Sequence, residues 1–375
     1  MRAHRLLLCL AMPAFLLGGC DRPDPAEAEG STVRLEERMS GTPDPGFARA
    51  LAPRPFVFPA DHGPHPDYAT EWWYLTGNLR DPSGAAFGYQ LTLFRIGLKP
   101  GEPETDSAWR THQIYMGHLA VSDIGARLHH SSSRFERAAL GLAGARADPL
   151  EVWIGPWSVR GQAGDPFPLH LDATGEDFAI DLVVAAGDRP PVLQGDRGLS
   201  QKSAAPGNAS YYYSYTRLPT QGEIRIGDRR WQVAGSSWFD REWSSSALGP
   251  DQAGWDWFAL QLEDGRDLMY YRMRGLDGQA QRFSQGVLVD TDGSVTRLSA
   301  DRVEAVPLRS WTGPTGNSYP VAWRLRIPDH GLDLAIEAAF DAQEMRHAVE
   351  YWEGAVRVSG SHRGVGYLEM SGYAR

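Results

Sequence analysis

Cysteine is nearly absent from this 375-residue chain, because Cys9 and Cys20 are its only two and both lie near the N-terminus. The rest of the chain has no thiol for an internal disulfide or for a thiolate zinc site. The sequence also lacks the HExxH and CxxC metal motifs, the GxSxG nucleophile motif and the glycine-rich motifs that bind nucleotides. We therefore expect neither a metal nor a cofactor.

Positive charge is scarce as well: 37 Lys and Arg stand against 47 Asp and Glu, for a net charge of −10. A nucleic-acid partner needs a basic face, so we expect none. No internal run is long and apolar enough to span a bilayer. His62, His65 and Asp67 have a spacing that a metal site could use, but Pro64 and Pro66 place them in a loop and no motif supports a metal.

The first 20 residues have the pattern of a signal peptide, with a basic start, an apolar run and then small residues. Leu17-Gly18-Gly19-Cys20 resembles the lipobox of bacterial lipoproteins, in which the Cys becomes the lipidated N-terminus. The alternative is a plain secretory signal. Asp21 resembles the residue that retains such proteins at the inner membrane. We therefore expect a lipoprotein of the bacterial cell envelope that is anchored in the inner membrane and faces the periplasm.

Beyond the leader, the composition predicts a tether followed by β-structure. Residues 21–55 are rich in Pro, Ala, Gly, Glu and Asp without an apolar period, which is typical of a disordered tether. From residue 56 the chain alternates between short apolar runs and Gly, Pro or Asp turns, as antiparallel barrels and sandwiches do. A helical period is present only at 133–142. We expect an all-β protein with two domains, at 56–247 and 248–375.

The expected strands follow from the apolar runs and their flanking turns. They cover residues 71–79, 86–96, 113–122, 150–159, 178–185, 210–216, 231–243, 255–263, 267–274, 286–290, 294–298, 319–327, 332–340, 351–359 and 363–370.

The most unusual stretch is the expected strand that ends at Trp243. Alternate side chains of a strand point to opposite faces, so Trp238, Asp240 and Glu242 share one face and Arg241 lies on the other. An apolar wall beside two acids can bind a greasy molecule and protonate it, because burial raises the pKa of a carboxyl group. Asp240 and Glu242 are therefore candidate catalytic acids. The alternative is a structural ion pair between these acids and an arginine.

A second stretch, Glu71-Trp72-Trp73-Tyr74, repeats the combination of an acid and tryptophans, so Glu71 is a third candidate acid. Aromatic residues make up 11% of the chain and are suited both to binding walls and to a β-sheet core. The candidate ligand-binding residues are Trp72, Trp73, Tyr74, Tyr211, Tyr213, Trp238, Arg241, Trp243, Trp255 and Trp257. The alternative for each aromatic residue is ordinary core packing.

Three segments together resemble the AttH/CrtC family of lipocalin-like proteins, which includes the carotenoid 1,2-hydratases. The segments are His65-Pro66-Asp67 with Glu71-Trp72-Trp73-Tyr74, then Trp238-Phe239-Asp240-Arg241-Glu242-Trp243, and then Tyr351-Trp352-Glu353-Gly354-Ala355-Val356 with Gly366-Tyr367-Leu368-Glu369-Met370-Ser371-Gly372-Tyr373. The resemblance implies two consecutive lipocalin-like (calycin) antiparallel β-barrels and a cavity for apolar molecules. It also implies, for the hydratase and cyclase members, chemistry on isoprenoid double bonds.

The chain departs from the hydratase branch, in which His flanks the central Asp on both sides. Phe239 and Arg241 occupy those positions here. The motif looks closer to the AttH branch, which is often encoded beside ABC-type export permeases. We therefore expect a lipoprotein that binds a lipid or terpenoid and serves an ABC-type exporter. The alternatives are a carotenoid 1,2-hydratase-like lyase, which adds water to an isoprenoid double bond by acid catalysis, and an interaction protein with solid barrels.

Overall fold

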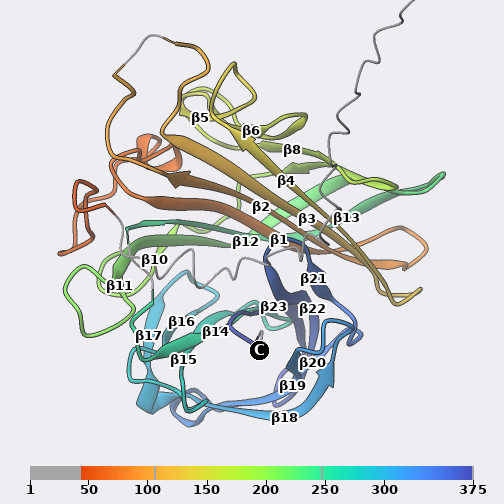
Figure 1. Ribbon diagram of the computed structural model, residues 1–375. Helices are drawn as coiled ribbons and strands as arrows, with labels where there is room; N and C mark the ends of the chain where they lie inside the picture. The colour runs from red at the N-terminus through yellow and green to blue at the C-terminus, as the bar shows by residue number, and fades with distance from the viewer. Residues whose placement is uncertain (1–43, 105–106, 246–247, 374–375) are drawn as a thin grey trace, which may run out of the picture. The chain divides into compact units, whose positions relative to one another are not determined.

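The computed structural model describes residues 44–104, 107–245 and 248–373 (Figure 1). The leader, Cys20 and Asp21 lie outside these residues. Helical structure in the described part is limited to three single turns, Ala60–His62, Ala300–Arg302 and Pro328–His330. No helix among the described residues is long and apolar enough to cross a membrane. The remaining regular structure is β-strand, so the expected all-β fold is confirmed.

Thirteen strands of the described chain form the first sheet, and all their pairings are antiparallel. They run in the order β4-β3-β2-β1-β13-β12-β9-β8-β7-β6-β5, with β10 and β11 on β12. The bounds are β1 Thr70–Arg80, β2 Ala86–Gly97, β3 Gln113–Asp123, β4 Leu128–Arg137, β5 Ala143–Ala147, β6 Leu150–Ile154, β7 Trp157–Arg160, β8 Leu169–Thr174, β9 Phe178–Val184, β10 Val192–Leu193, β11 Leu199–Gln201, β12 Ala209–Ile226 and β13 Arg229–Ser244.

Ten strands form the second sheet, in the order β17-β16-β15-β14-β23-β22-β20-β19-β18, with β21 on β22. The bounds are β14 Gln252–Leu262, β15 Asp267–Gly275, β16 Gln285–Val289, β17 Val295–Ser299, β18 Glu304–Thr312, β19 Ser318–Ile327, β20 Leu332–Ala338, β21 Glu344–Arg346, β22 Glu350–Gly360 and β23 Gly364–Met370. In both sheets the first strand pairs with the second strand on one side and with the last strand on the other. The two sheets thus repeat one connectivity.

Each sheet curves around a hydrophobic core of its own. In Figure 1 the second sheet bends into a nearly closed barrel, and the first forms a half-barrel. Leu75 and Phe239 belong to the core of the first barrel, and Phe258 and Trp323 to that of the second. The predicted pair of antiparallel barrels is confirmed. Side chains of the protein fill both barrel cores.

A third layer of side chains lies between the two sheets. Tyr74 and Trp238 of the first sheet pack there with Trp257 and Met269 of the second. Neighbouring residues on the same strands, such as Leu75, belong instead to a barrel core. This follows from strand alternation, because successive side chains of β1 and β13 point to opposite faces. Both faces of most of β1 and of the Ser237–Ser244 part of β13 are therefore buried.

Several sequence expectations need correction. Residues 133–142 are not helical, because β4 continues to Arg137 and pairs along its length with β3, and cross-strand pairing overrides the local helical period. The expected strand 150–159 is the hairpin of β6 and β7. Strand β18 was not expected because it is an exposed edge strand without apolar alternation. Part of the expected tether packs on the body, since Phe47 and Ala50 are buried.

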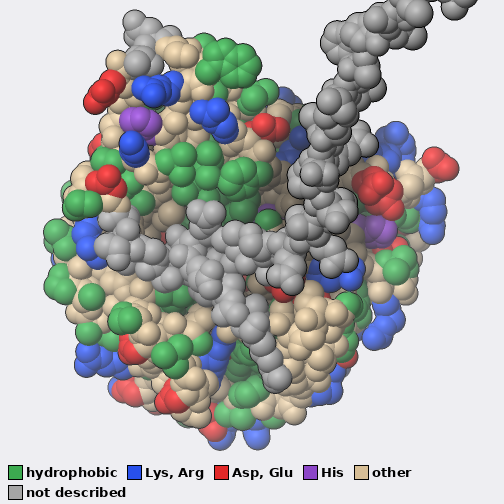
Figure 2. All heavy atoms as spheres, viewed as in Figure 1, with side chains coloured by type: hydrophobic (Ala, Val, Ile, Leu, Met, Phe, Trp, Pro, Cys, Tyr) green, Lys and Arg blue, Asp and Glu red, His purple; other side chains and the backbone are tan. Residues whose placement is uncertain are grey.

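Acidic and basic side chains are interspersed on the face drawn in Figure 2. The described residues visible there form no continuous basic surface of the kind that follows a nucleic-acid backbone.

Candidate functional site

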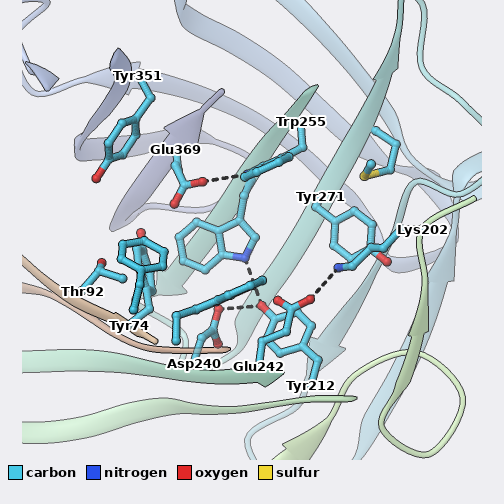
Figure 3. Close-up of a pocket in the computed structure, with 14 residues that line it drawn as sticks. Tyr74, Thr92, Lys202, Tyr212, Asp240, Glu242, Trp255, Tyr271, Tyr351 and Glu369 are labelled. Atoms are coloured by element: carbon cyan, nitrogen blue, oxygen red, sulfur yellow. Dashed lines mark hydrogen bonds and ion pairs between the residues drawn. The ribbon is translucent and has the colours of Figure 1, made fainter. Parts of the chain in front are cut away.

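A pocket lies between the two sheets, where the sequence motifs of both halves meet (Figure 3). Its empty space is about 730 Å³, including solvent at its mouth. Aromatic rings form most of its wall, and the polar groups are few and converge from both sheets. The lining residues are Trp72, Tyr74, Thr92, Phe94, Lys202, Tyr212, Asp240, Glu242, Trp255, Trp257, Tyr271, Met273, Tyr351 and Glu369.

Asp240 of β13 is the carboxyl group that the first sheet contributes most deeply, with 3% of the residue exposed. Its Oδ2 accepts a hydrogen bond from the Tyr212 hydroxyl at 2.5 Å, and its Oδ1 accepts bonds from Ser214 and from Trp238 Nε1, the latter at 2.7 Å. Burial outweighs these three donors and raises the pKa of Asp240 to about 7, with a further contribution from the charge of Glu242. Asp240 can therefore hold or release a proton near neutral pH.

Tyr212 of β12 links this carboxyl group to the second sheet. Its hydroxyl accepts a hydrogen bond from Trp257 Nε1 at 3.1 Å while it donates to Asp240. Burial, followed by the charges of Asp240 and Glu242, raises the pKa of Tyr212 well above its usual range. Tyr212 thus keeps its proton and fixes the orientation of the Asp240 carboxyl group.

Glu369 of β23 is a second acid, supplied by the second sheet. Its Oε1 accepts a hydrogen bond from Trp255 Nε1 at 2.7 Å (Figure 3). Burial raises the pKa of Glu369 to about 7 against the effect of that bond, and the charges of Asp240 and Glu242 contribute. The residue as a whole is more exposed than Asp240. Two acids with similar pKa values therefore face one aromatic pocket.

Glu242 is held in a different way, by an ion pair. Its Oε1 lies 3.1 Å from Lys202 Nζ and also accepts a hydrogen bond from Ser210. The Lys202 ammonium lies 4.1 Å from the centre of the Tyr271 ring. Burial lowers the pKa of Lys202, but Glu242 and Tyr271 outweigh it and raise that pKa overall. The pair is a fixed polar element at one end of the pocket, and Glu242 is less suited than Asp240 to donate a proton.

Glu71 lies outside the pocket, on the opposite face of the first sheet. Arg95 Nε and Arg241 Nη2 each bind one of its carboxylate oxygens, and the three side chains are fully buried. Burial alone would raise the pKa of Glu71, but the two guanidinium groups hold it well below its usual range. Glu71 therefore stays ionised and cannot serve as a proton donor to this pocket. This corrects its interpretation as a candidate catalytic acid of the site.

The sequence profile of the AttH-like family matches residues 49–373. The chain belongs to the AttH-like family. The crystal structure of an AttH-type protein from Nitrosomonas europaea is similar, with 32% identity, a TM-score of 0.78, and coverage of 87% of this chain and 100% of that one. A search of the curated proteins finds no match.

Two further structures share the fold of this AttH-like chain. Kievitone hydratase from Nectria haematococca is 15% identical, with a TM-score of 0.66 and coverage of 89% of this chain and 96% of that one. CghA with Sch210972 is 13% identical, with a TM-score of 0.54 and coverage of 92% and 98%. The expected lipocalin-like two-barrel fold is confirmed. Identities this low establish the fold alone.

The structure brings together some of the predicted ligand-binding residues and separates others. Trp72, Tyr74, Trp255 and Trp257 line the pocket, and Trp238 lies directly behind Asp240 as its hydrogen-bond donor. The other five predicted residues face away from the pocket. They are Trp73, Arg241, Trp243, Tyr211 and Tyr213.

Packing accounts for these five residues. The Arg241 guanidinium lies 3.9 Å from the centre of the Trp73 ring. Tyr211, Tyr213 and Trp243 form a separate aromatic cluster with Phe56 and other residues. The histidines near them also have protein partners: His62 Nδ1 bonds the Tyr213 hydroxyl, and His65 stacks on Trp243. Among the described residues, no three His, Cys, Asp or Glu side chains gather as a metal group.

Sequence reasoning missed Tyr212, Lys202 and Glu369 as site residues. Tyr212 stands between Tyr211 and Tyr213, which the sequence analysis chose as ligand-binding candidates because they share a face. The structure instead places Tyr212 directly opposite Glu242 in the pairing of β12 with β13. Glu369 was part of a quoted motif, but only the contact between the two sheets brings it near Asp240. Lys202 lies in a loop after β11, and no local pattern marks it.

The buried ion pairs of Glu71 predict a large effect on stability. Glu71→Gln removes the carboxylate and leaves Arg95 and Arg241 as buried cations without a counter-charge, so we expect a loss of about 3–5 kcal/mol in the free energy of unfolding. Urea unfolding followed by tryptophan fluorescence measures it. Glu223→Gln, which removes an exposed partner of Arg230, is the control and should lose less than about 1 kcal/mol. Equal losses in both variants would show that the buried cluster is not structural.

The raised pKa of Glu369 predicts a pH-dependent gain from Glu369→Gln. Because the folded-state pKa of about 7 lies above the usual 4.5, the wild type loses stability as the pH rises through that interval. The variant cannot ionise there. We expect it to be more stable than the wild type by about 1–3 kcal/mol at pH 8 and equal to it at pH 4.

Urea unfolding across this pH range, with the exposed Glu176→Gln as control, measures the difference. A gain that does not change with pH would contradict the assignment.

Proposed function

We propose that this AttH-like chain binds an apolar, unsaturated molecule between its two sheets and adds water to a double bond by acid catalysis. The observation that supports this proposal is the pair of carboxyl groups, Asp240 and Glu369, which face an aromatic pocket with pKa values near 7. General acids and bases work best when their pKa is close to the working pH. We therefore prefer the hydratase-like lyase, which the sequence analysis gave as an alternative, to the lipid-binding carrier.

The reaction needs one of the two carboxyl groups to be protonated and the other to be ionised. Asp240, protonated, donates its proton to one carbon of the double bond, and a carbocation forms at the other carbon. Trp72, Trp255 and Trp257 line the pocket, and the π faces of such rings can stabilise a cation. The oxygen of a water molecule bonds to the cationic carbon and its proton passes to the Glu369 carboxylate. An alkene and water thus become an alcohol, and a proton returns from Glu369 to Asp240 through solvent.

The Phe239 and Arg241 neighbours of Asp240 do not prevent this chemistry. Arg241 points to the opposite face of β13, where it binds Glu71. Among the residues that the structure describes, no arginine therefore lies beside Asp240 to lower its pKa, and Tyr212 and Ser214 supply hydrogen bonds that orient it. The fold shared with kievitone hydratase agrees with the proposal, although at 15% identity the chemistry depends on the pocket of this chain.

The sequence of the leader favours a second candidate function. Its resemblance to a lipobox supports a lipoprotein whose Cys20 is lipidated, which is anchored in the inner membrane and faces the periplasm. There the pocket would carry a lipid or terpenoid to an ABC-type exporter. This carrier needs the aromatic pocket but no proton transfer, so the fate of the bound molecule separates the two functions.

Replacing Asp240 tests the proposed reaction. The purified full chain is incubated with a bacterial lipid and terpenoid extract in oxygen-18 water, and the bound molecules are extracted and weighed by mass spectrometry. We expect a product that carries one labelled oxygen. Asp240→Asn should keep the unmodified molecule bound and lose product by at least about a hundredfold.

Glu223→Gln, at an exposed ion pair, is the matched control and should behave as the wild type. An unmodified lipid bound by the wild type and by Asp240→Asn alike would favour the carrier instead.

The two acids predict a rate that peaks near neutral pH. Asp240 must be protonated and Glu369 ionised, so the rate should fall above about pH 7 as Asp240 ionises and below about pH 7 as Glu369 becomes protonated. In Glu369→Gln the fall on the acid side should disappear while the fall on the basic side remains. Initial rates with the substrate found above, from pH 5 to pH 9, measure both limbs. Retention of the acid-side fall in the variant would exclude Glu369 as the base.

A further inference from the structure

An ion pair lies at one end of the pocket, and the proposed reaction does not use it. Lys202, from the loop after β11, and Glu242 of β13 both line the pocket, with Lys202 Nζ 3.1 Å from Glu242 Oε1 (Figure 3). Both residues are buried, with 8% and 6% of their surfaces exposed. The desolvation of two buried charges can exceed their mutual attraction, so stability is a weak reason for such a pair.

Aromatic rings from both sheets hold the ammonium group in place. It lies 5.3 Å from the centre of the Tyr212 ring in the first sheet and 4.1 Å from that of the Tyr271 ring in the second. On the other side of the pair, the Ser210 hydroxyl donates a hydrogen bond to Glu242 Oε1. The pair thus places one donor group and one acceptor group side by side on the pocket wall.

Both charged groups have more hydrogen-bonding capacity than their contacts with the described residues use. An ammonium group has three N–H donors, and Lys202 has Glu242 and Tyr271 as partners. A carboxylate accepts about four hydrogen bonds, and Glu242 has Lys202 and Ser210 as partners. Counted over the described residues, a donor and an acceptor therefore remain for a ligand.

A hydroxyl group is the ligand chemistry that suits this arrangement. Its O–H can donate to the carboxylate while its oxygen accepts from the ammonium group. The pair is neutral overall, so an anionic head group attracted by Lys202 is repelled by Glu242, and the reverse holds for a cationic one. A hydrocarbon would displace water from the pair without replacing its hydrogen bonds. A neutral alcohol or phenol avoids each of these penalties.

We propose that Lys202 and Glu242 bind a hydroxyl group of the substrate, which is therefore a neutral unsaturated alcohol or phenol and neither a pure hydrocarbon nor a charged lipid. That this ligand is a substrate rests on the proposed function. Asp240 and Glu242 share one face of β13 two residues apart, which separates them by about 6–7 Å along the strand. We expect a similar distance between the bound hydroxyl group and the double bond that Asp240 protonates.

Binding of geraniol and three analogues tests the hydroxyl site without turnover. Geraniol is a neutral alcohol with two trisubstituted double bonds. The analogue 2,6-dimethylocta-2,6-diene lacks its hydroxyl group, and geranic acid and geranylamine carry a carboxylate and an ammonium group instead. Quenching of tryptophan fluorescence in the full chain reports binding, because Trp72, Trp255 and Trp257 line the pocket.

The charged analogues are compared with geraniol at pH 6. This is below the pKa of about 7 of Asp240 and Glu369, so both acids are mostly protonated and the ion pair dominates the charge of the pocket. We expect the acid and the amine to bind at least about tenfold more weakly than geraniol, because each loses its hydration without gaining a counter-charge of its own. Equal or tighter binding of either one would overturn the assignment of a neutral hydroxyl group.

The hydrocarbon is compared with geraniol in a variant without the two charges. Lys202→Met/Glu242→Leu replaces the pair by apolar side chains, which proteins often tolerate, whereas either single change would leave a buried charge unpaired. The preference for geraniol over the hydrocarbon should fall by at least about tenfold, because both hydrogen-bonding groups are lost. Arg230→Met/Glu223→Leu, at an exposed ion pair, is the matched control and should keep the wild-type preference. The same preference in the wild type and in Lys202→Met/Glu242→Leu would overturn the hydroxyl site.

Turnover of geraniol in oxygen-18 water tests the position of the reacting bond. Water should add across the remote double bond, with hydrogen on carbon 6 and the labelled oxygen on carbon 7, while the double bond beside the hydroxyl group stays intact. NMR of the product identifies the carbon. Addition beside the hydroxyl group would overturn the expected spacing. If geraniol binds with the expected preference and is not hydrated, the hydroxyl site stands and the proposed hydration of such alkenes fails.

Discussion

Side-chain alternation along β13 is the constraint on which the rest of the structure depends. From Ser237 to Ser244 the strand is buried on both faces, so each charged residue of this part meets a low-dielectric environment, and the face that it occupies decides its partners. Arg241 turns toward Glu71 and Arg95, and Asp240 turns toward Tyr212 and Ser214. Glu71 has two cations beside it and stays ionised, whereas the described donors to Asp240 are all neutral and its pKa is raised to about 7. A shift of one residue in register would exchange these two outcomes.

The two clusters also differ in what they contribute to stability. Around Glu71, opposite charges offset the desolvation that burial imposes on each of them. Around Asp240, Glu369 and Glu353, the buried acid opposite Glu369 on β22, the described residues provide no such offset. Lys202, the one cation among the described residues that line the pocket, is paired with Glu242. Three carboxyl groups with raised pKa values destabilise the folded chain at neutral pH relative to acid pH. Such groups concentrate at sites that transfer protons, where a residue is kept for chemistry rather than for folding.

Much of this architecture was predictable because β-sheet periodicity is local. The shared face of Trp238, Asp240 and Glu242 follows from a spacing of two residues, and most strands were predicted where apolar runs alternate between turns. The structural role of Glu71 could not be predicted in this way, because it depends on an ion pair with Arg95, which lies on a different strand. Glu369 and Lys202 could not be found either, because they reach the pocket only through contact between the two sheets. Local patterns set which residues share a face, and long-range packing sets which faces meet.

The repeated connectivity of the two sheets explains why the site has an acid on each side. Asp240 lies on β13 and Glu369 on β23, and each of these strands is the last of its sheet and pairs with the first strand and the penultimate one. The first strands match as well: Trp72 and Tyr74 of β1 have the same spacing as Trp255 and Trp257 of β14, and all four line the pocket. Equivalent strands of two similar units thus supply equivalent walls. The difference between them lies in what surrounds each acid. Tyr212, Ser214 and Trp238 orient Asp240, whereas the structure's described residues give Glu369 one hydrogen-bond donor, Trp255, and place Glu353 beside it. Two sheets with the same connectivity thus present similar carboxyl groups in different hydrogen-bond environments, and the proposed reaction assigns the acid and the base on the basis of that difference.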